Sequence, residues 1–130
     1  MTGRALVFDT SYFVQLFYSK DAARTRLLKR LAQSSAPKWI SVITLIEVQK
    51  ISIEADGKEV ADSRSSLMQQ DFKVKAVDAE VATIAASLQA SKGLSGPQSM
   101  IAATAITLAA TCVTDDPALK KLGTPPSSWI

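Results

Sequence analysis

Residues 5–11, with the sequence ALVFDTS, set the strongest limit on how this chain can fold. The apolar residues that open this run are too few for a buried helix, but they suit a strand that is covered on both faces. Asp9, Thr10 and Ser11 follow at once, and such residues favour turns and helix N-caps. Apolar side chains then recur at helical spacing as far as Phe17. The run predicts a buried strand, an acid at its carboxyl end and a helix. Because ligands of open α/β sheets bind at the carboxyl ends of strands, Asp9 is the first candidate functional residue.

The rest of the chain alternates predicted strands with predicted helices. Further strands are expected at 39–42, 72–77, 111–114 and 129–130. Thr44 and Glu47 have the spacing of a capping box and begin a helix that Gly57 breaks. A loop at 93–97 leads to a helix at about 98–109. The order predicts an α/β fold in which a central, mainly parallel sheet lies between helices.

Composition narrows what such a chain can do. Its 130 residues suit one domain over residues 1–130, and the absence of histidine excludes Ser–His and Cys–His catalysis and histidine-ligated zinc. The single cysteine, Cys112, cannot form an internal disulfide, so we expect a reducing, cytoplasmic location. The apolar segment 100–113 is too short to span a bilayer, and no membrane association is expected. A net charge of +3 is compatible with a nucleic-acid partner, and the basic residues within 24–30 are interpreted as a solvated helix face that contributes modestly to RNA binding.

Three acids share one placement in the predicted fold. Asp9, Glu47 and Asp116 each lie at or just past the end of a strand, where a helix begins. Each of them alone can be explained as a helix-capping residue. If the strands are parallel, however, the three carboxylates meet at one edge of the sheet and repel one another unless a cation lies between them. Oxygen ligands without histidine or cysteine favour Mg²⁺ or Mn²⁺. Three hydroxyl side chains could orient ligands or bound water, or could serve only as turn residues: Thr10, Ser11 and Thr114.

Four segments resemble, in order and spacing, those of the PIN domain, and more narrowly those of VapC-type toxin ribonucleases and their archaeal relatives. These segments are 6–11, 41–47, 100–105 and 113–116. The resemblance spans nearly the whole chain and implies a three-layer α/β/α fold with metal-dependent hydrolysis of RNA phosphodiester bonds. It also implies that Asp9, Glu47 and Asp116 are the catalytic acids and bind Mg²⁺ or Mn²⁺. By the same resemblance we expect a toxin that forms a homodimer and is inhibited by a small antitoxin protein.

Gln98 departs from the family pattern. The family usually has an aspartate two residues before the run at 100–103, and this chain has glutamine there. Glutamine offers a cation only a neutral carbonyl oxygen, which weakens a site whose affinity depends on charge. Asp115 is a candidate replacement ligand. The departure leaves open a second hypothesis, a catalytically impaired PIN-like module that binds RNA or a partner protein.

Two further classes fit the residues less well. A haloacid-dehalogenase-like phosphotransferase or phosphatase also has a nucleophilic aspartate at a strand end. Such enzymes typically have a second acid two residues later, where this chain has Ser11. A dinucleotide-binding domain needs a Gly-x-Gly-x-x-Gly pattern after the first strand, and no such pattern follows residue 8.

Overall fold

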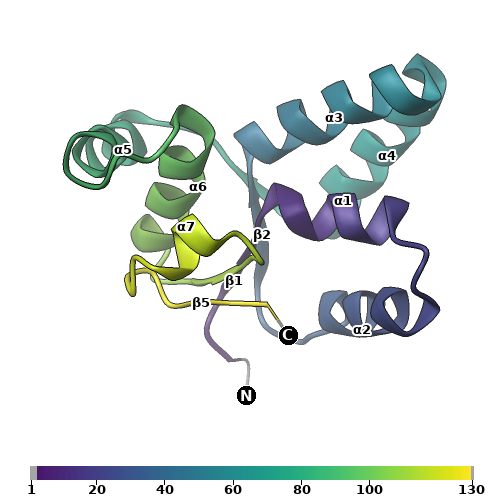
Figure 1. The fold of residues 1–130 in the computed structure, drawn as a ribbon, viewed down its shortest axis with the longest axis horizontal. Coiled ribbons are helices and arrows are strands. Elements are labelled where there is room, and N and C mark those ends of the chain that lie inside the picture. The colour runs from purple at the N-terminus through teal and green to yellow at the C-terminus, as the bar shows by residue number, and fades with distance from the viewer. Residues whose placement is uncertain (1–2, 130) are drawn as a thin grey trace.

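The computed structural model describes residues 3–129 and contains one sheet of five strands, all of them parallel (Figure 1). The strands are β1 (Leu6–Phe8), β2 (Lys38–Ser41), β3 (Lys73–Lys75), β4 (Thr111–Val113) and β5 (Ser127–Ser128). Their order in the sheet is β3-β2-β1-β4-β5. The chain therefore builds outward from β1 in one direction, and then returns to the other side of β1. A reversal of this kind opens a crevice at the carboxyl ends of β1 and β4.

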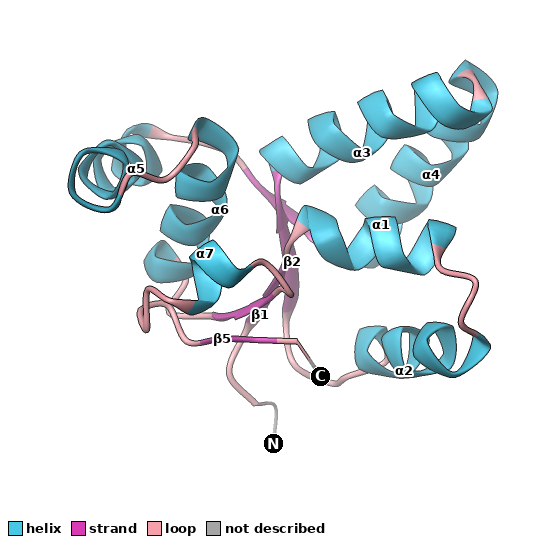
Figure 2. Ribbon diagram, in the orientation of Figure 1, coloured by secondary structure: helices cyan, strands magenta, loops and turns pink. Residues whose placement is uncertain are grey.

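The helices cover both faces of the sheet (Figure 2). They are α1 (Thr10–Tyr18), α2 (Ala22–Ala32), α3 (Val42–Asp56), α4 (Lys58–Asp71), α5 (Ala79–Lys92), α6 (Gly96–Thr107) and α7 (Pro117–Lys120). Because successive side chains of a strand point to opposite faces, Phe8 packs among residues of α1 to α4, whereas Val7 packs among residues of α6 and α7. Both side chains are fully buried. The three-layer α/β/α prediction is confirmed.

Most predicted elements are present, and β3 lies at the edge of the sheet as the lysines of 72–77 indicated. The predicted capping box at Thr44 and Glu47 is wrong. The second strand ends at Ser41, and the Ser41 hydroxyl accepts a hydrogen bond from the backbone N–H of Ile43 at 3.1 Å. Val42 therefore begins α3 instead of ending β2, and Thr44 is buried inside the helix.

Two other boundaries differ from the prediction. Helix α6 begins at Gly96 rather than at about 98, because Ser95 provides its N-cap and a proline is favourable in the first helical turn. The last strand is formed by Ser127–Ser128 rather than by residues 129–130, of which Ile130 lies outside the described residues. In the part of the chain that the structure describes, no helix is both long and apolar enough to cross a membrane.

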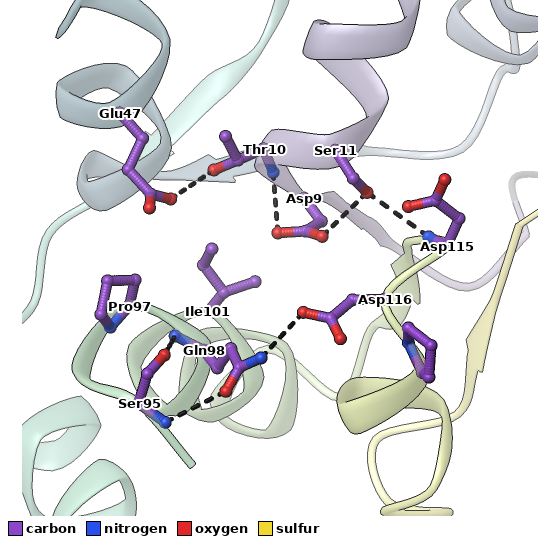
Figure 3. Close-up of a pocket in the computed structure, with 11 residues that line it drawn as sticks. Asp9, Thr10, Ser11, Glu47, Ser95, Pro97, Gln98, Ile101, Asp115 and Asp116 are labelled. Atoms are coloured by element: carbon purple, nitrogen blue, oxygen red, sulfur yellow. Dashed lines mark hydrogen bonds between the residues drawn. The ribbon is translucent and has the colours of Figure 1, made fainter. Parts of the chain in front are cut away.

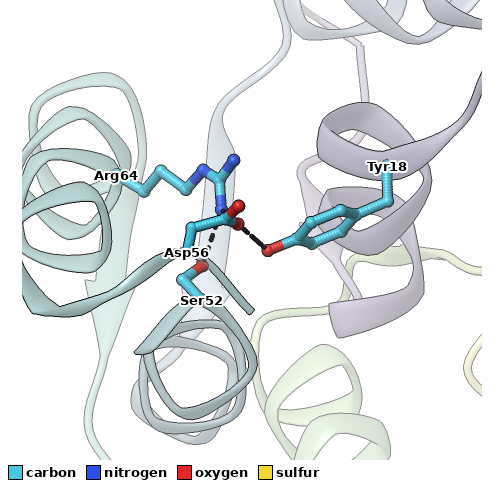
Figure 4. Close-up of polar contacts among 4 residues, drawn as sticks. All are labelled: Tyr18, Ser52, Asp56 and Arg64. Atoms are coloured by element: carbon cyan, nitrogen blue, oxygen red, sulfur yellow. Dashed lines mark hydrogen bonds and ion pairs between the residues drawn. The ribbon is translucent and has the colours of Figure 1, made fainter. Parts of the chain in front are cut away.

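A polar cluster joins α1, α3 and α4 (Figure 4). The Arg64 Nη1 atom donates hydrogen bonds to Asp56 Oδ2 at 2.8 Å, Tyr18 Oη at 2.8 Å and Ser52 Oγ at 3.1 Å. The Tyr18 hydroxyl also donates to Asp56 Oδ2 at 2.6 Å, and these hydrogen bonds from Tyr18 and Arg64 lower the pKa of Asp56. The Arg64 guanidinium lies 4.6 Å from the centre of the Phe17 ring. The cluster therefore fixes the far ends of α1 and α3, whose other ends face the crevice.

Candidate functional site

A cleft of about 480 Å³ opens at the carboxyl ends of β1 and β4, between α1, α3, α6 and α7 (Figure 3). Its acidic lining residues are Asp9, Glu47, Asp115 and Asp116. Among the residues that the structure describes, no lysine or arginine lines this cleft. The three acids that were predicted to meet at one sheet edge do line one polar cavity, together with Asp115. The cleft holds an excess of negative charge, as a cation site does.

Asp9 follows β1 directly and is only 6% exposed. Its Oδ1 atom accepts a hydrogen bond from the backbone N–H of Thr10 at 2.7 Å. Its Oδ2 atom accepts from Ser11 Oγ at 2.9 Å and from Thr114 Oγ1 at 2.7 Å. Burial raises the pKa of Asp9 above its usual value, these hydrogen bonds oppose the rise, and the nearby charge of Asp116 adds to it. Asp9 is therefore a fixed carboxylate at the base of the cleft.

Asp116 both caps a helix and lines the cleft. Its Oδ1 atom accepts a hydrogen bond from the backbone N–H of Ala118 at 2.9 Å, so the capping interpretation of this residue is confirmed. Its own backbone N–H donates to Thr114 Oγ1 at 2.9 Å. The Thr114 hydroxyl therefore bridges Asp9 and Asp116, which explains why both acids occupy defined positions.

Gln98 reaches Asp116 with its amide nitrogen. Its Nε2 atom donates to Asp116 Oδ2 at 3.0 Å. Its Oε1 atom accepts from the backbone N–H of Ser95 at 3.0 Å, and the Ser95 hydroxyl accepts from the backbone N–H of Gln98 at 3.2 Å. This reciprocal pair is a capping box at the start of α6, with a Ser-x-x-Gln pattern that was not among the predicted helix starts. The oxygen with which Gln98 could bind a cation is therefore directed to Ser95.

Glu47 reaches the cleft from α3 and is half-buried. Its Oε1 atom accepts a hydrogen bond from Thr10 Oγ1 at 2.6 Å. The Thr10 hydroxyl lies 3.4 Å from that of Thr44, which is fully buried. Because Thr10 is the first residue of α1, this contact joins the near ends of α1 and α3.

The remaining candidates lie at the rim. Ser11 Oγ contacts Asp9 and lies 3.4 Å from the backbone nitrogen of Asp115, which donates to it. The Asp115 carboxylate is set apart from Asp116 in Figure 3. The apolar part of the lining, which the sequence did not reveal, consists of Pro97, Ile101 and Pro117.

The donors suit a hard divalent cation, because every candidate ligand is an oxygen. Within residues 3–129, however, no three Asp, Glu, His or Cys side chains are grouped closely enough to hold a metal ion. The pair formed by Asp9 and Asp116 is the nearest arrangement to a ligand set, since the charge of one raises the pKa of the other. The residues therefore fit the ion chemically, with Gln98 placing a donor nitrogen on Asp116 where a further carboxylate would complete the set.

A family model of the PIN domain matches residues 6–125 of the chain. A comparison with curated protein sequences finds no match. Solved structures share the fold. One is the crystal structure of VapBC2 from Rickettsia felis bound to a promoter DNA fragment, with a TM-score of 0.78 and 20% identity over 97% of this chain and 98% of that one. A toxin-antitoxin complex from Klebsiella pneumoniae matches with a TM-score of 0.74 and 22% identity, covering 95% of each chain.

A third structure is that of Mycobacterium tuberculosis VapC20, a Sarcin-Ricin loop cleaving toxin. It matches with a TM-score of 0.76 and 18% identity, over 91% of this chain and 95% of that one. Identities this low establish a shared fold. The acids of the cleft described above lie within the segment that the family model matches.

Proposed function

Given that the chain belongs to the PIN domain family, we propose that it is a metal-dependent endoribonuclease that hydrolyses RNA phosphodiester bonds. The observation that carries the proposal is the acidic cleft at the switch point of the sheet, where no lysine or arginine of the described residues compensates Asp9, Glu47, Asp115 and Asp116. Carboxylates gathered without a basic partner are typical of sites that bind a divalent cation.

In this proposal Asp9, Asp116 and Glu47 hold Mg²⁺ or Mn²⁺. Asp115 is a further candidate ligand, and the Gln98 oxygen becomes one only if its bond to Ser95 breaks. Such a cation, when bound, polarises the scissile phosphate and lowers the pKa of the attacking water.

The protein side chains have separate tasks. Thr114 holds Asp9 and Asp116 in place through its hydroxyl, and Ser11 fixes the same oxygen of Asp9. Glu47 has one oxygen bound to Thr10, and its Oε2 atom has no hydrogen-bond partner in the described part of the chain. We assign this free oxygen as the acceptor of the proton that the attacking water releases.

The direct test compares the wild type with Asp9→Asn on single-stranded and hairpin RNA, with Mg²⁺, with Mn²⁺ and with chelator. We expect cleavage by the wild type only when metal is present, and a loss of at least about 100-fold in the variant, the scale expected when a metal ligand is lost. The variant should be at least as stable as the wild type without metal, because it removes a buried charge. Cleavage that persists in Asp9→Asn, or that ignores chelator, would contradict the proposal.

A second candidate function is RNA binding without efficient cleavage. Gln98 favours it, because its amide nitrogen occupies an oxygen of Asp116 that a cation would otherwise use. Tight binding of RNA by the wild type with no cleavage in either metal would support this candidate over the nuclease.

We also propose that the protein is the toxin of a toxin–antitoxin pair and binds a small antitoxin. The similar structures from Rickettsia felis and Klebsiella pneumoniae are toxin–antitoxin complexes. Ile46 and Ile53 of α3 are 59% and 47% exposed and share a shallow groove of about 360 Å³, and Leu67 of α4 is 56% exposed. Exposed apolar side chains in one groove suit a protein partner.

Co-purification with the product of a neighbouring small reading frame tests the antitoxin. Sedimentation of the isolated chain tests the homodimer that we propose alongside it. A monodisperse monomer that neither binds such a product nor is inhibited by it would refute both parts.

A further inference from the structure

A second groove, of about 560 Å³, adjoins the acidic cleft. It lies on the side of the sheet where α5 and α7 are found (Figure 1). The two cavities meet at Asp116 and Pro117, which line both of them. Its remaining lining residues are Lys92, Leu94, Ala118, Lys121 and Leu122. A chain molecule held at Asp116 can therefore extend into this groove.

The groove has the charge that the cleft lacks. Lys92 ends α5 and Lys121 follows α7, and both are exposed. Neither lysine has an ion-pair partner within 4.0 Å among the described residues, whereas Lys58 and Lys75 each bind an aspartate at 2.8 Å. Two free ammonium groups thus border a cavity that opens beside four carboxylates.

A polyanion cannot enter the acidic cleft unaided. Each phosphate that approaches Asp9 and Asp116 meets like charges, and a bound cation compensates the scissile phosphate alone. The neighbouring phosphates of the strand need cations of their own, and lysines that border the path of the strand provide them.

We propose that this groove binds the nucleotide next to the scissile phosphate. Lys92 and Lys121 contact its phosphates, and Leu94, Ala118 and Leu122 pack against its sugar and base. The proposal rests on the proposed ribonuclease function and adds a substrate subsite to it.

The chemistry of the groove also predicts how it recognises RNA. Apart from Asp116 and the two lysines, its lining residues are apolar or proline, so few groups are available to hydrogen-bond the edge of a base. Contacts to phosphate and packing against an aromatic base tolerate any sequence. We therefore expect this subsite to accept all four bases.

The test measures binding of a labelled, short single-stranded RNA of mixed sequence in chelator, where no cleavage occurs. The variant is Lys92→Gln/Lys121→Gln, and the control is Lys120→Gln, which removes one exposed lysine of α7 that does not line the groove. Thermal melts of all three proteins check that the folds are equal.

We expect the double variant to bind roughly tenfold more weakly at low salt, and its slope of log affinity against log salt to be smaller by about 1.4, or about 0.7 for each phosphate that a lysine no longer neutralises. The control should weaken binding far less. With metal, the double variant should show a higher KM and an unchanged kcat, because the lysines bind the strand away from the reacting atoms.

Unchanged affinity and slope in the double variant, or an equal weakening in Lys120→Gln, would overturn the subsite even if the wild type cleaves RNA. Selective weakening in the double variant without cleavage in any metal would instead support the groove as an RNA-binding surface and refute the nuclease. A wild type that binds no RNA would overturn both.

Discussion

Gln98→Glu is the sharpest test of how this site handles charge. Glutamate has the length of glutamine, so one carboxylate oxygen can keep the 3.0 Å contact with the backbone N–H of Ser95. The other oxygen then takes the place of the amide nitrogen, 3.0 Å from Asp116 Oδ2. A hydrogen bond becomes a contact between two negative charges. Gln98→Asp would restore the residue usual in the family, but its shorter side chain would give up the capping contact.

The structure sets the size of the effect. Two unit charges 3.0 Å apart repel by about 1.4 kcal/mol at the dielectric constant of water and by about 5.5 kcal/mol at an effective value of 20. Both residues are half-buried, so the cost lies between these limits. For a chain of 130 residues, each kcal/mol corresponds to about 4 °C in Tm. Without metal, the Tm of Gln98→Glu should therefore fall by at least about 5 °C.

A divalent cation should reverse this loss. The variant offers one more anionic oxygen to the ion, so calorimetric titration with Mg²⁺ or Mn²⁺ should show tighter binding, each tenfold corresponding to about 1.4 kcal/mol. Saturation at 100 times Kd should return about 2.7 kcal/mol of stability. RNA cleavage should rise in parallel.

The control is Gln98→Glu/Asp116→Asn, which exchanges donor and acceptor between the two positions. Its stability without metal should recover, because an amide again faces a carboxylate, and its affinity for metal should stay low. If Gln98→Glu leaves both the melting curve and the affinity for metal unchanged, then Gln98 does not contact Asp116 and the fourth ligand position has been misplaced.

Three further outcomes test other parts of the structure. Thr10→Val should release Glu47, cost about 1 kcal/mol in urea unfolding and lower kcat, and Thr10→Ser should restore both, since serine keeps the hydroxyl that donates at 2.6 Å; equal kcat in all three proteins would exclude a positioning role. Tyr12→Phe should lose about 1–3 kcal/mol, because the Tyr12 hydroxyl donates to the buried carbonyl of Leu28 at 2.6 Å. Burial raises the pKa of Tyr12 from 10.0 to about 12, so the unfolded wild type ionises first and its stability should fall by up to about 2.7 kcal/mol as the pH rises from 10 to 12, a loss that the variant should lack in melts across this range. Charge reversal of the basic residues of α2 should weaken RNA binding modestly and reduce its salt dependence, and an unchanged salt slope would exclude phosphate contacts there.

Local patterns predicted most elements, because each depended on information within a few residues. Apolar runs bounded by Asp9 or Asp116 specify both the strand and the following helix, and the structure has both. The choice between Ser41 and Thr44 as a helix cap could not be made locally. It depends on where β2 stops, and that point is set by its pairing with β1 and β3.

The site was predictable as a set of acids and unpredictable in its hydrogen bonds. Strand-end placement brought Asp9 and Asp116 to one cleft, as parallel strands require. The orientation of the Gln98 amide depends on Ser95 and on an acid that lies 18 residues away in sequence. The groove beside Lys92 likewise exists only where α5 and α7 meet, which no single sequence window contains.

The wide separation of the site's parts along the chain has a consequence for biosynthesis. Thr114 donates to Asp9 across 105 positions, and the backbone N–H of Thr114 is itself held by the carbonyl of Ser128 in β5 at 2.9 Å. A ribosome therefore makes Asp9 among the first residues and Asp116 among the last, and the strand that anchors Thr114 comes later still. A nuclease built in this order has no complete acidic cleft while most of it is being translated, so the nascent chain cannot attack the RNA of the machine that produces it.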